Sequence, residues 1–240
     1  MQKDKIDILS TRTTDEAFAA KASDANITLD SFSFIEVQAV SSNELANQLH
    51  TLATKSLIAI FTSTNAVNAV AEQIHNIPDW KIFCTSGRTK ELVIQVFGEH
   101  NIISSAKNAG QLAERIISYG CSDVTFFCGD QRLNELPETL YKNGIKTEEI
   151  IVYTTVQTPV LIEKNYDGIL FFSPSAVHSF FSANTIAIDV VLFSIGHTTT
   201  ATIQSYCTNP VVTSEWPGSD NLLACVTHFY NQTPEIKGTI

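Results

Sequence analysis

Apolar and polar positions fall along the chain in blocks that predict strands followed by helices. Residues 57–61 form a continuous apolar run, as expected of a parallel strand covered on both faces. Apolar residues at helical spacing follow in 67–74, where Thr64 or Asn65 is expected to cap the helix. Such alternation predicts mostly parallel sheets. The other predicted strands are 6–9, 81–85, 102–105, 124–128, 168–172, 190–195 and 211–213, and the other predicted helices are 14–22, 42–52, 89–97, 108–119, 133–143, 175–183, 198–206 and 219–230.

The chain also repeats itself about halfway along. FTSTNAV at 61–67 returns as FSPSAV at 172–177, with Ser63 aligned to Ser173 at an offset of 110 positions. SGRT at 86–89 returns as IGHT at 195–198, and QLA at 111–113 as NLL at 221–223. Chance similarity of strand-to-helix turns explains any one match, but three matches in order favour two related α/β units. Two units form a cleft, where ligands usually bind.

Two extended segments suggest how the units are connected. Residues 33–40 and 146–155 alternate apolar and polar positions, as the two strands of a linker would. Too few strands follow the second segment for a full sheet, so the N-terminal strand and helix are expected to complete it. The predicted fold is therefore α/β, with two related domains, each a mostly parallel sheet flanked by helices, joined by a two-stranded linker with a cleft between them. One domain comprises 1–34 plus 156–240, and the inserted domain comprises 35–155.

Charge and composition limit the classes of partner that the protein is expected to bind. The formal net charge is −10 and there is no Lys/Arg cluster, which argues against nucleic-acid binding. There is no apolar run of the roughly 20 residues that a membrane helix needs, and no signal-peptide core. Five cysteines without CxxC spacing indicate free thiols in a reducing compartment. The expected protein is thus a cytoplasmic monomer that binds neither membrane nor nucleic acid.

The candidate chemistry lies in four turns that place Ser, Thr or Gly just before a helix. Their hydroxyls and the free N–H groups of the first helical turn can bind carboxylate or phosphate despite the global negative charge. N-capping alone would explain any single turn, but the turns occur in both halves. The sequence has no GxGxxG, Walker A, HExxH or GxSxG motif, and its histidines show no metal-ligand spacing. The candidate residues are Thr62, Ser63, Gly87, Thr89, Ser173, Ser175, Gly196 and Thr198.

Two further side chains are candidates. Arg132 follows the predicted strand 124–128 and either meets an anion there or is a solvated surface residue. Tyr153 lies on the returning linker segment. A single tyrosine more often packs than catalyses, but without a constellation of His, Cys and carboxylate groups Tyr153 is the best available proton donor.

These segments together resemble the uroporphyrinogen-III synthase family over nearly the whole chain. Each motif is weak alone, whereas the ordered series with its spacing is fairly specific. The sequence departs from the family pattern at Thr13 and His197, where Pro is usual, and at Ser86, where an apolar residue is common. The matching segments are Thr11-Arg12, FTSTNAV (61–67), GRT (87–89), CGDQR (128–132) with LPETL (136–140) and Gly144, VYTT (152–155), FSPSAV (172–177) and IGHTT (195–199).

The resemblance implies cofactor-free cyclisation of hydroxymethylbilane, with inversion of ring D and loss of water. In that interpretation Tyr153 assists departure of the hydroxyl group, and the turn residues orient the substrate's carboxylates. Arg12 and Arg132 are further candidates for carboxylate contacts. Two alternatives stay open from the residues alone. One is a non-enzymatic two-domain protein that binds a small anion, and the other is a degenerate family member that retains the fold.

Overall fold

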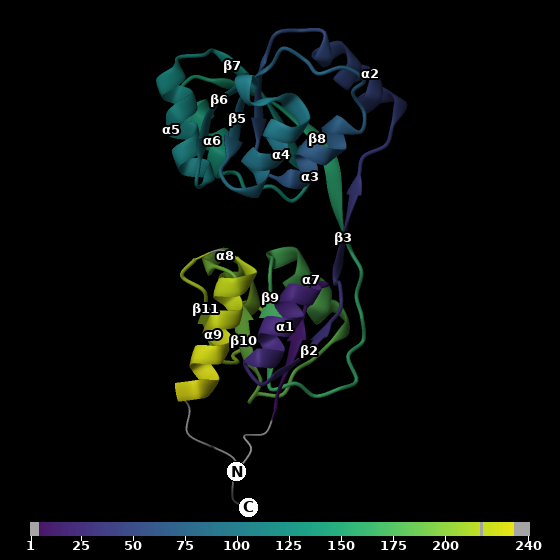
Figure 1. The fold of residues 1–240 in the computed structure, drawn as a ribbon, viewed down its shortest axis with the longest axis vertical. Coiled ribbons are helices and arrows are strands. Elements are labelled where there is room, and N and C mark those ends of the chain that lie inside the picture. Colours follow the sequence, from purple (N-terminus) through teal and green to yellow (C-terminus); the bar gives the residue numbers. More distant parts are fainter. Residues whose placement is uncertain (1–4, 217, 233–240) are drawn as a thin grey trace, which may run out of the picture. The chain divides into compact units, whose positions relative to one another are not determined.

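The computed structural model describes residues 5–216 and 218–232. The chain divides into two compact units. Unit 1 consists of Met1–Glu36 and Val156–Ile240, and unit 2 of Val37–Thr155. The chain passes between the units within two strands, β3 (Ile35–Ala39) and β8 (Lys146–Gln157), which are neighbours in one sheet (Figure 1).

Unit 1 contains a five-stranded sheet in the order β11-β10-β9-β1-β2. Neighbouring strands run parallel throughout this sheet. Its strands are β1 (Ile6–Ser10), β2 (Ile27–Ser31), β9 (Gly168–Phe171), β10 (Val191–Ser194) and β11 (Val211–Thr213), and its helices are α1 (Glu16–Asp24), α7 (Pro174–Ala183), α8 (His197–Gln204) and α9 (Ser219–Gln232).

Unit 2 contains a six-stranded sheet in the order β3-β8-β7-β4-β5-β6. The pairs from β8 to β6 run parallel. In addition to β3 and β8, its elements are α2 (Asn43–Ala53), β4 (Ile58–Phe61), α3 (Thr64–Ala71), β5 (Lys81–Thr85), α4 (Arg88–Phe97), the 3₁₀ helix η1 (Glu99–Asn101), β6 (Ile102–Ala106), α5 (Ala109–Tyr119), β7 (Asp123–Gly129) and α6 (Glu135–Lys142).

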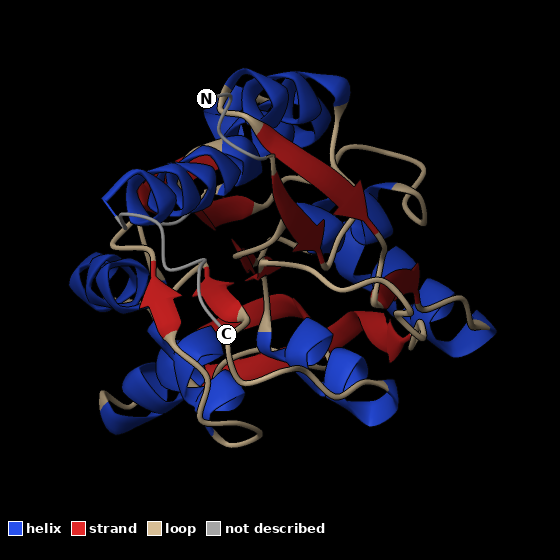
Figure 2. Cartoon of the chain, turned by 90° about the horizontal axis from the view of Figure 1, so that it is seen from below, coloured by secondary structure: helices blue, strands red, loops and turns tan. Residues whose placement is uncertain are grey.

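In each unit the central strands are buried on both faces, and the strands lie between helices (Figure 2). Ala59 and Phe61 of β4 belong to one core cluster, while Ile60 belongs to the cluster on the other face. In unit 1, Ile8 and Leu9 of β1 likewise belong to core clusters on opposite faces of the sheet. Apolar runs in these strands follow from this double coverage, because successive side chains point to opposite faces.

The sequence repeat is also a structural repeat. β4 and β9 occupy the same position in their sheets, and the helices after them both begin at a capping serine, Ser63 or Ser173. Residues 61–70 and 171–180 show the same order of buried, half-buried and exposed positions. At the other side of β9, β1 and β2 take the positions that β7 and β8 take beside β4. Unit 1 is therefore a circularly permuted relative of unit 2, completed by the N-terminal segment.

The α/β fold class with parallel sheets flanked by helices is confirmed. One strand was missed by the pattern, β2, whose sequence ITLDS has polar residues on both faces. It follows Asn26, which adopts a positive φ of 61°, and is defined by its parallel pairing with β1. The capping prediction was wrong by one or two residues, because the cap of α3 is Ser63 rather than Thr64 or Asn65. The ends of the other predicted helices and strands differ from the observed ends by a few residues.

One buried hydroxyl distinguishes the two units. Ser179 of α7 is 0% exposed, and within the described residues its Oγ has no hydrogen-bond partner. The corresponding residue of unit 2 is Ala69, which is 2% exposed. A buried hydroxyl without a partner destabilises the folded state.

We therefore expect Ser179→Ala to raise the free energy of unfolding of unit 1 by about 1 kcal/mol. The matched variant Ala69→Ser should lower the stability of unit 2 by a similar amount. Hydrogen exchange in β9 and β10, and in β4 and β5, would report the two units separately. Faster exchange in β9 and β10 of Ser179→Ala would contradict the prediction.

Candidate functional site

The candidate residues gather at the carboxyl edge of each sheet, where parallel strands end and helices begin. In unit 2, β4 and β5 are adjacent, so the turns after them lie side by side. Thr85 Oγ1 donates to the Thr62 carbonyl oxygen at 3.2 Å and joins these turns. In unit 1, β9 and β10 are adjacent in the same way. Ligands of open α/β sheets bind at this edge.

In each of helices α3 and α7, one N–H group of the first turn already donates to the side chain of the capping residue. Ser63 Oγ accepts a hydrogen bond from the Asn65 N–H at 3.1 Å. Ser173 Oγ accepts one from the Ala176 N–H at 3.2 Å, and Pro174 occupies the first turn of its helix. The serine hydroxyls therefore cap their own helices, which stabilises them by about 1 kcal/mol each.

Helices α4 and α8 begin differently. Each has a glycine as N-cap, Gly87 or Gly196, and neither has a side-chain capping bond. A Cβ placed on either glycine would meet no heavy atom within 4 Å, so the space before each helix is open. These two helix N-termini therefore offer free N–H groups and room for an approaching oxygen atom.

The hydroxyls beside these glycines are not equally accessible. Thr89 of α4 is buried at 7% exposure, whereas Thr198 of α8 is exposed. Thr199 takes the buried position in unit 1 at 3% exposure. Thr62 and Ser175 are half-buried. Of the two predicted threonines that follow a glycine N-cap, Thr198 is thus the one whose side chain lies on the surface.

Each of the two arginines contacts other side chains of its own unit. The Arg12 guanidinium lies over the Phe172 ring, 4.1 Å from its centroid, and donates to Ser219 Oγ. Arg12 is therefore held at the carboxyl edge of unit 1 by a cation–π contact and a neutral partner. Arg132 instead forms an ion pair with Glu149 and donates to Asn134 Oδ1. The charge of Arg132 is therefore already balanced by Glu149.

Tyr153 of β8 lies beside the end of β7, where a glycine leaves room for its ring. Gly129 is its register partner, after a shift in pairing at Cys128. A Cβ on Gly129 would lie 2.4 Å from Tyr153 Cζ and 2.8 Å from its hydroxyl oxygen, so any side chain there would displace the half-buried ring. The Asp130 N–H donates to the Tyr153 carbonyl at 3.2 Å, and Asp130 Oδ1 accepts from the Thr155 N–H at 2.9 Å.

Sequence reasoning missed the residues that position this edge. Gly129 and Asp130 lie inside the CGDQR segment, but their roles depend on pairing with β8. In unit 1, Thr200 Oγ1 forms hydrogen bonds with Ser194 Oγ and with Thr213 Oγ1. The run of threonines at 198–200 was a visible signal for this network, although its partners come from two other segments.

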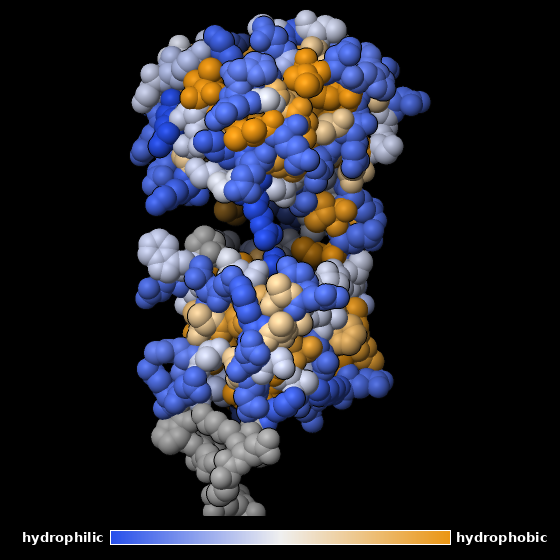
Figure 3. Space-filling model, in the orientation of Figure 1, coloured by the Kyte–Doolittle hydropathy of each residue, from blue (hydrophilic) through white to orange (hydrophobic). Residues whose placement is uncertain are grey.

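Other chemistries have little support in the structure. Burial raises the pKa of Cys84 and of Cys128 to about 11, so neither thiol is a ready nucleophile. In residues 5–216 and 218–232 there is no group of three or more His, Cys, Asp or Glu side chains placed to hold a metal ion. Nor does a helix in these ranges have the length and apolar character needed to cross a membrane. The face shown in Figure 3 is largely hydrophilic, with hydrophobic side chains scattered among polar ones.

Comparison with known proteins identifies the family. The family model described as uroporphyrinogen-III synthase HemD matches residues 16–224. The chain belongs to the uroporphyrinogen-III synthase family. It is accordingly an enzyme of tetrapyrrole biosynthesis, as the ordered motifs indicated.

Solved structures of uroporphyrinogen-III synthases share the fold. One is a mutant enzyme from the extremely thermophilic bacterium Thermus thermophilus, with 14% identity, a TM-score of 0.63, and coverage of 94% of this chain and 98% of that one. Another is the enzyme from Helicobacter pylori, with 16% identity, a TM-score of 0.65, and coverage of 93% and 99%. A search of curated proteins found no match. At such low identity the structural likeness concerns the fold, and residue roles must be tested in this chain.

Gly196 gives the sharpest test of the helix N-termini. Its φ of 173° is extended backbone that alanine also adopts, and the space around it is open. Gly196→Ala should therefore change the unfolding free energy by less than about 0.5 kcal/mol. It should still lower synthase activity about tenfold, because the methyl group enters the space before α8 that an oxygen atom needs. Steady-state kinetics and urea unfolding measure the two effects.

Gly87→Ala is the matched comparison. Its φ of 74° lies in the left-handed region, so alanine there should cost about 1 kcal/mol of stability as well as activity. Wild-type activity in Gly196→Ala would show that the N-terminus of α8 does not bind substrate.

Proposed function

We propose that this protein converts hydroxymethylbilane into uroporphyrinogen III. The hydroxyl group of the terminal hydroxymethyl leaves with electrons supplied by its pyrrole ring, and an azafulvene forms. Ring closure at the substituted carbon of ring D gives a spiro intermediate, whose rearrangement inverts that ring. The hydroxyl group and one proton leave as water. No step requires an added cofactor.

The observation that carries the proposal is the pair of open, glycine-started helices α4 and α8. The substrate has eight carboxylates, while the protein has a net charge of −10. Attraction to the whole molecule cannot hold such a substrate, so binding must come from local donors. Free N–H groups before α4 and α8, the Thr198 hydroxyl and Arg12 supply such donors at the carboxyl edges.

Holding the flexible substrate is the main catalytic task in this proposal. Spontaneous closure joins the unsubstituted position and gives the symmetric type-I ring. The enzyme must favour attack at the crowded carbon of ring D, which is a matter of geometry more than of acid–base strength. We propose that units 1 and 2 act as the two domains of the enzyme, and that the turns bearing Ser63, Thr89, Ser173 and Thr198 contribute the substrate contacts. Arg132, already paired with Glu149, contributes less.

Tyr153 is the proposed proton donor to the departing hydroxyl group. Its backbone is fixed through Asp130, and its ring lies across Gly129 at the carboxyl edge of unit 2. A phenol in this place can donate a hydrogen bond to the leaving oxygen atom without a thiol, metal or carboxylate partner.

The deciding experiment is a product analysis. Freshly prepared hydroxymethylbilane would be incubated with and without the protein, and the oxidised uroporphyrins separated by isomer. A shift from type I to type III is expected. Type I alone, from folded protein, would contradict the proposal and favour a binding protein that retains the family fold.

Tyr153→Phe tests the proton donor. Removal of the hydroxyl should slow type-III formation by about 10- to 100-fold, in line with the loss of general acid catalysis. Because the ring remains over Gly129, thermal unfolding should stay as in the wild type. Tyr141→Phe, at a residue 81% exposed near the end of α6, is the matched control and should keep full activity. Equal rates for the two variants would remove Tyr153 from the mechanism.

A further inference from the structure

Trp216 is an exposed indole at the edge where unit 1 is proposed to act. It lies between β11 and α9, after the carboxyl end of its strand. Its exposed fraction is 68%, whereas the other tryptophan, Trp80, is 1% exposed within the core of unit 2. No sequence motif singled it out.

The segment that carries this indole is anchored. The Ser214 N–H donates to the Ser194 carbonyl at 2.9 Å, and Ser214 Oγ donates to the Trp216 carbonyl at 2.7 Å. Ser214 itself is 3% exposed. The backbone beside the indole is therefore held against β10 while the ring faces outward, so little ordering of this backbone is needed when a ligand binds.

The indole borders a hollow of about 840 Å³ between the end of β11 and α9. Apolar atoms of Val212, Cys225 and Phe229 contribute to its lining. The described residues that line it include Glu215 and His228 but no Lys or Arg. The face of an aromatic ring would find an apolar surface here.

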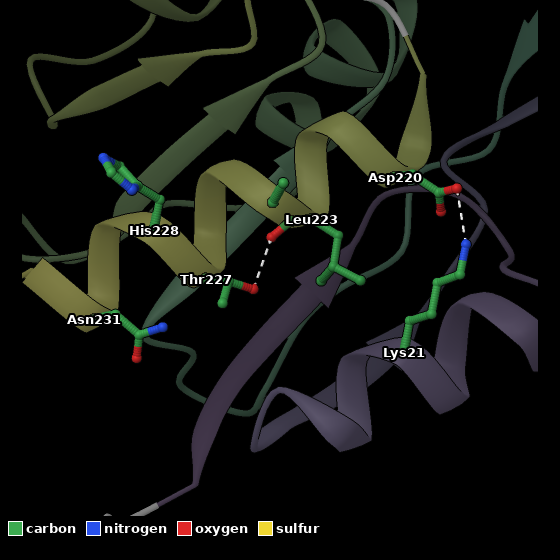
Figure 4. Close-up of a pocket in the computed structure, with 7 residues that line it drawn as sticks. Lys21, Asp220, Leu223, Thr227, His228 and Asn231 are labelled. Carbon is green, nitrogen blue, oxygen red and sulfur yellow. Dashed lines mark hydrogen bonds and ion pairs between the residues drawn. The ribbon is translucent and has the colours of Figure 1, made fainter.

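A second hollow, of about 520 Å³, provides a contrast. It lies between α1 and α9 and is lined by Lys21 and Asp220, which pair with each other at 2.8 Å (Figure 4). Its cation is already paired with a carboxylate, and the exposed imidazole of His228 lines this hollow as well as the larger one. Of these two hollows, the one bordered by Trp216 is the one suited to an aromatic ring.

Hydrogen bonds connect one lining residue of the hollow to the first turn of α8. Thr213 lines it and bonds to Thr200 at 2.6 Å between their oxygen atoms. Thr200 in turn contacts the carbonyl of Gly196 at 3.3 Å. Thr213 is therefore linked through Thr200 to the first turn of α8, where a substrate carboxylate is proposed to bind.

We propose that Trp216 binds the face of one pyrrole ring of the substrate while the acidic groups of that ring point toward α8 or solvent. The proposal rests on the function proposed above. Each pyrrole is an electron-rich aromatic ring, and stacking on an indole is typically worth about tenfold or more in affinity. Trp216 would therefore help to position the flexible chain during ring closure.

Kinetics of three variants test this contact. Trp216→Ala should raise KM for hydroxymethylbilane about tenfold, with a smaller effect on kcat. Trp216→Phe keeps an aromatic face and should stay within about twofold of the wild type. Tyr141→Ala removes an even more exposed aromatic side chain, at the end of α6 that lies away from the carboxyl edge, and should leave KM unchanged.

A direct binding measurement separates stacking from a structural effect. Addition of uroporphyrinogen III, the proposed product, should quench the indole emission of the wild type more than that of Trp216→Phe. Wild-type KM in Trp216→Ala, in a protein that still forms type III, would overturn this proposal alone. Absence of type III from the wild type would instead overturn the proposed function.

Discussion

The parallel direction of the strands is the constraint on which the rest of this structure depends. Parallel neighbours require a crossover between them, so parallel strands that follow each other along the chain are joined through helices, and both sheet faces become covered. The same constraint brings the carboxyl ends of the paired strands to one edge. Turns far apart in sequence, such as those after β4 and β7, thereby become neighbours. The candidate site follows from this packing rather than from any single motif.

At that edge, the N-cap residue of each helix decides whether the first N–H groups of the helix are paired or open to a ligand. A serine such as Ser63 satisfies an N–H group of its own helix and stabilises the fold. A glycine such as Gly196 leaves those groups unpaired and exposes them to a ligand. In each unit a serine-capped helix, α3 or α7, is followed by a helix that begins at glycine, α4 or α8. We infer that the repeat divides stability and binding between neighbouring turns of each sheet.

The absence of strong acid–base groups among the candidate residues suits a reaction limited by geometry. The substrate supplies the electrons that expel its own hydroxyl group, and the protein must hold reactive carbons in one arrangement. Groups that fix position therefore matter more than groups with shifted pKa values. Gly129, which admits the Tyr153 ring, and Ser214, which anchors the segment before Trp216, are examples.

Much of the fold and part of the candidate site could be predicted from local patterns. The apolar run at 57–61 and the repeat of Ser63 as Ser173 report burial and helix starts, which depend on residues close in sequence. β2 could not be read in this way, because its polar sequence becomes a strand through pairing with β1. The unequal exposure of Thr89 and Thr198 was equally invisible, since burial depends on how each helix packs on its sheet.

Apart from β2, the sequence by itself thus determined the order of the strands and α-helices, the repeated turns and the family. The tertiary structure alone decided which residues each candidate group contacts. Arg132 pairs with Glu149, a residue 17 positions away on β8, and Arg12 rests on Phe172, 160 positions away. The segment before the exposed Trp216 is tied to β10 through the Ser214 N–H, which donates to the Ser194 carbonyl. Such contacts arise when segments distant in sequence pack together, so local sequence patterns cannot predict them.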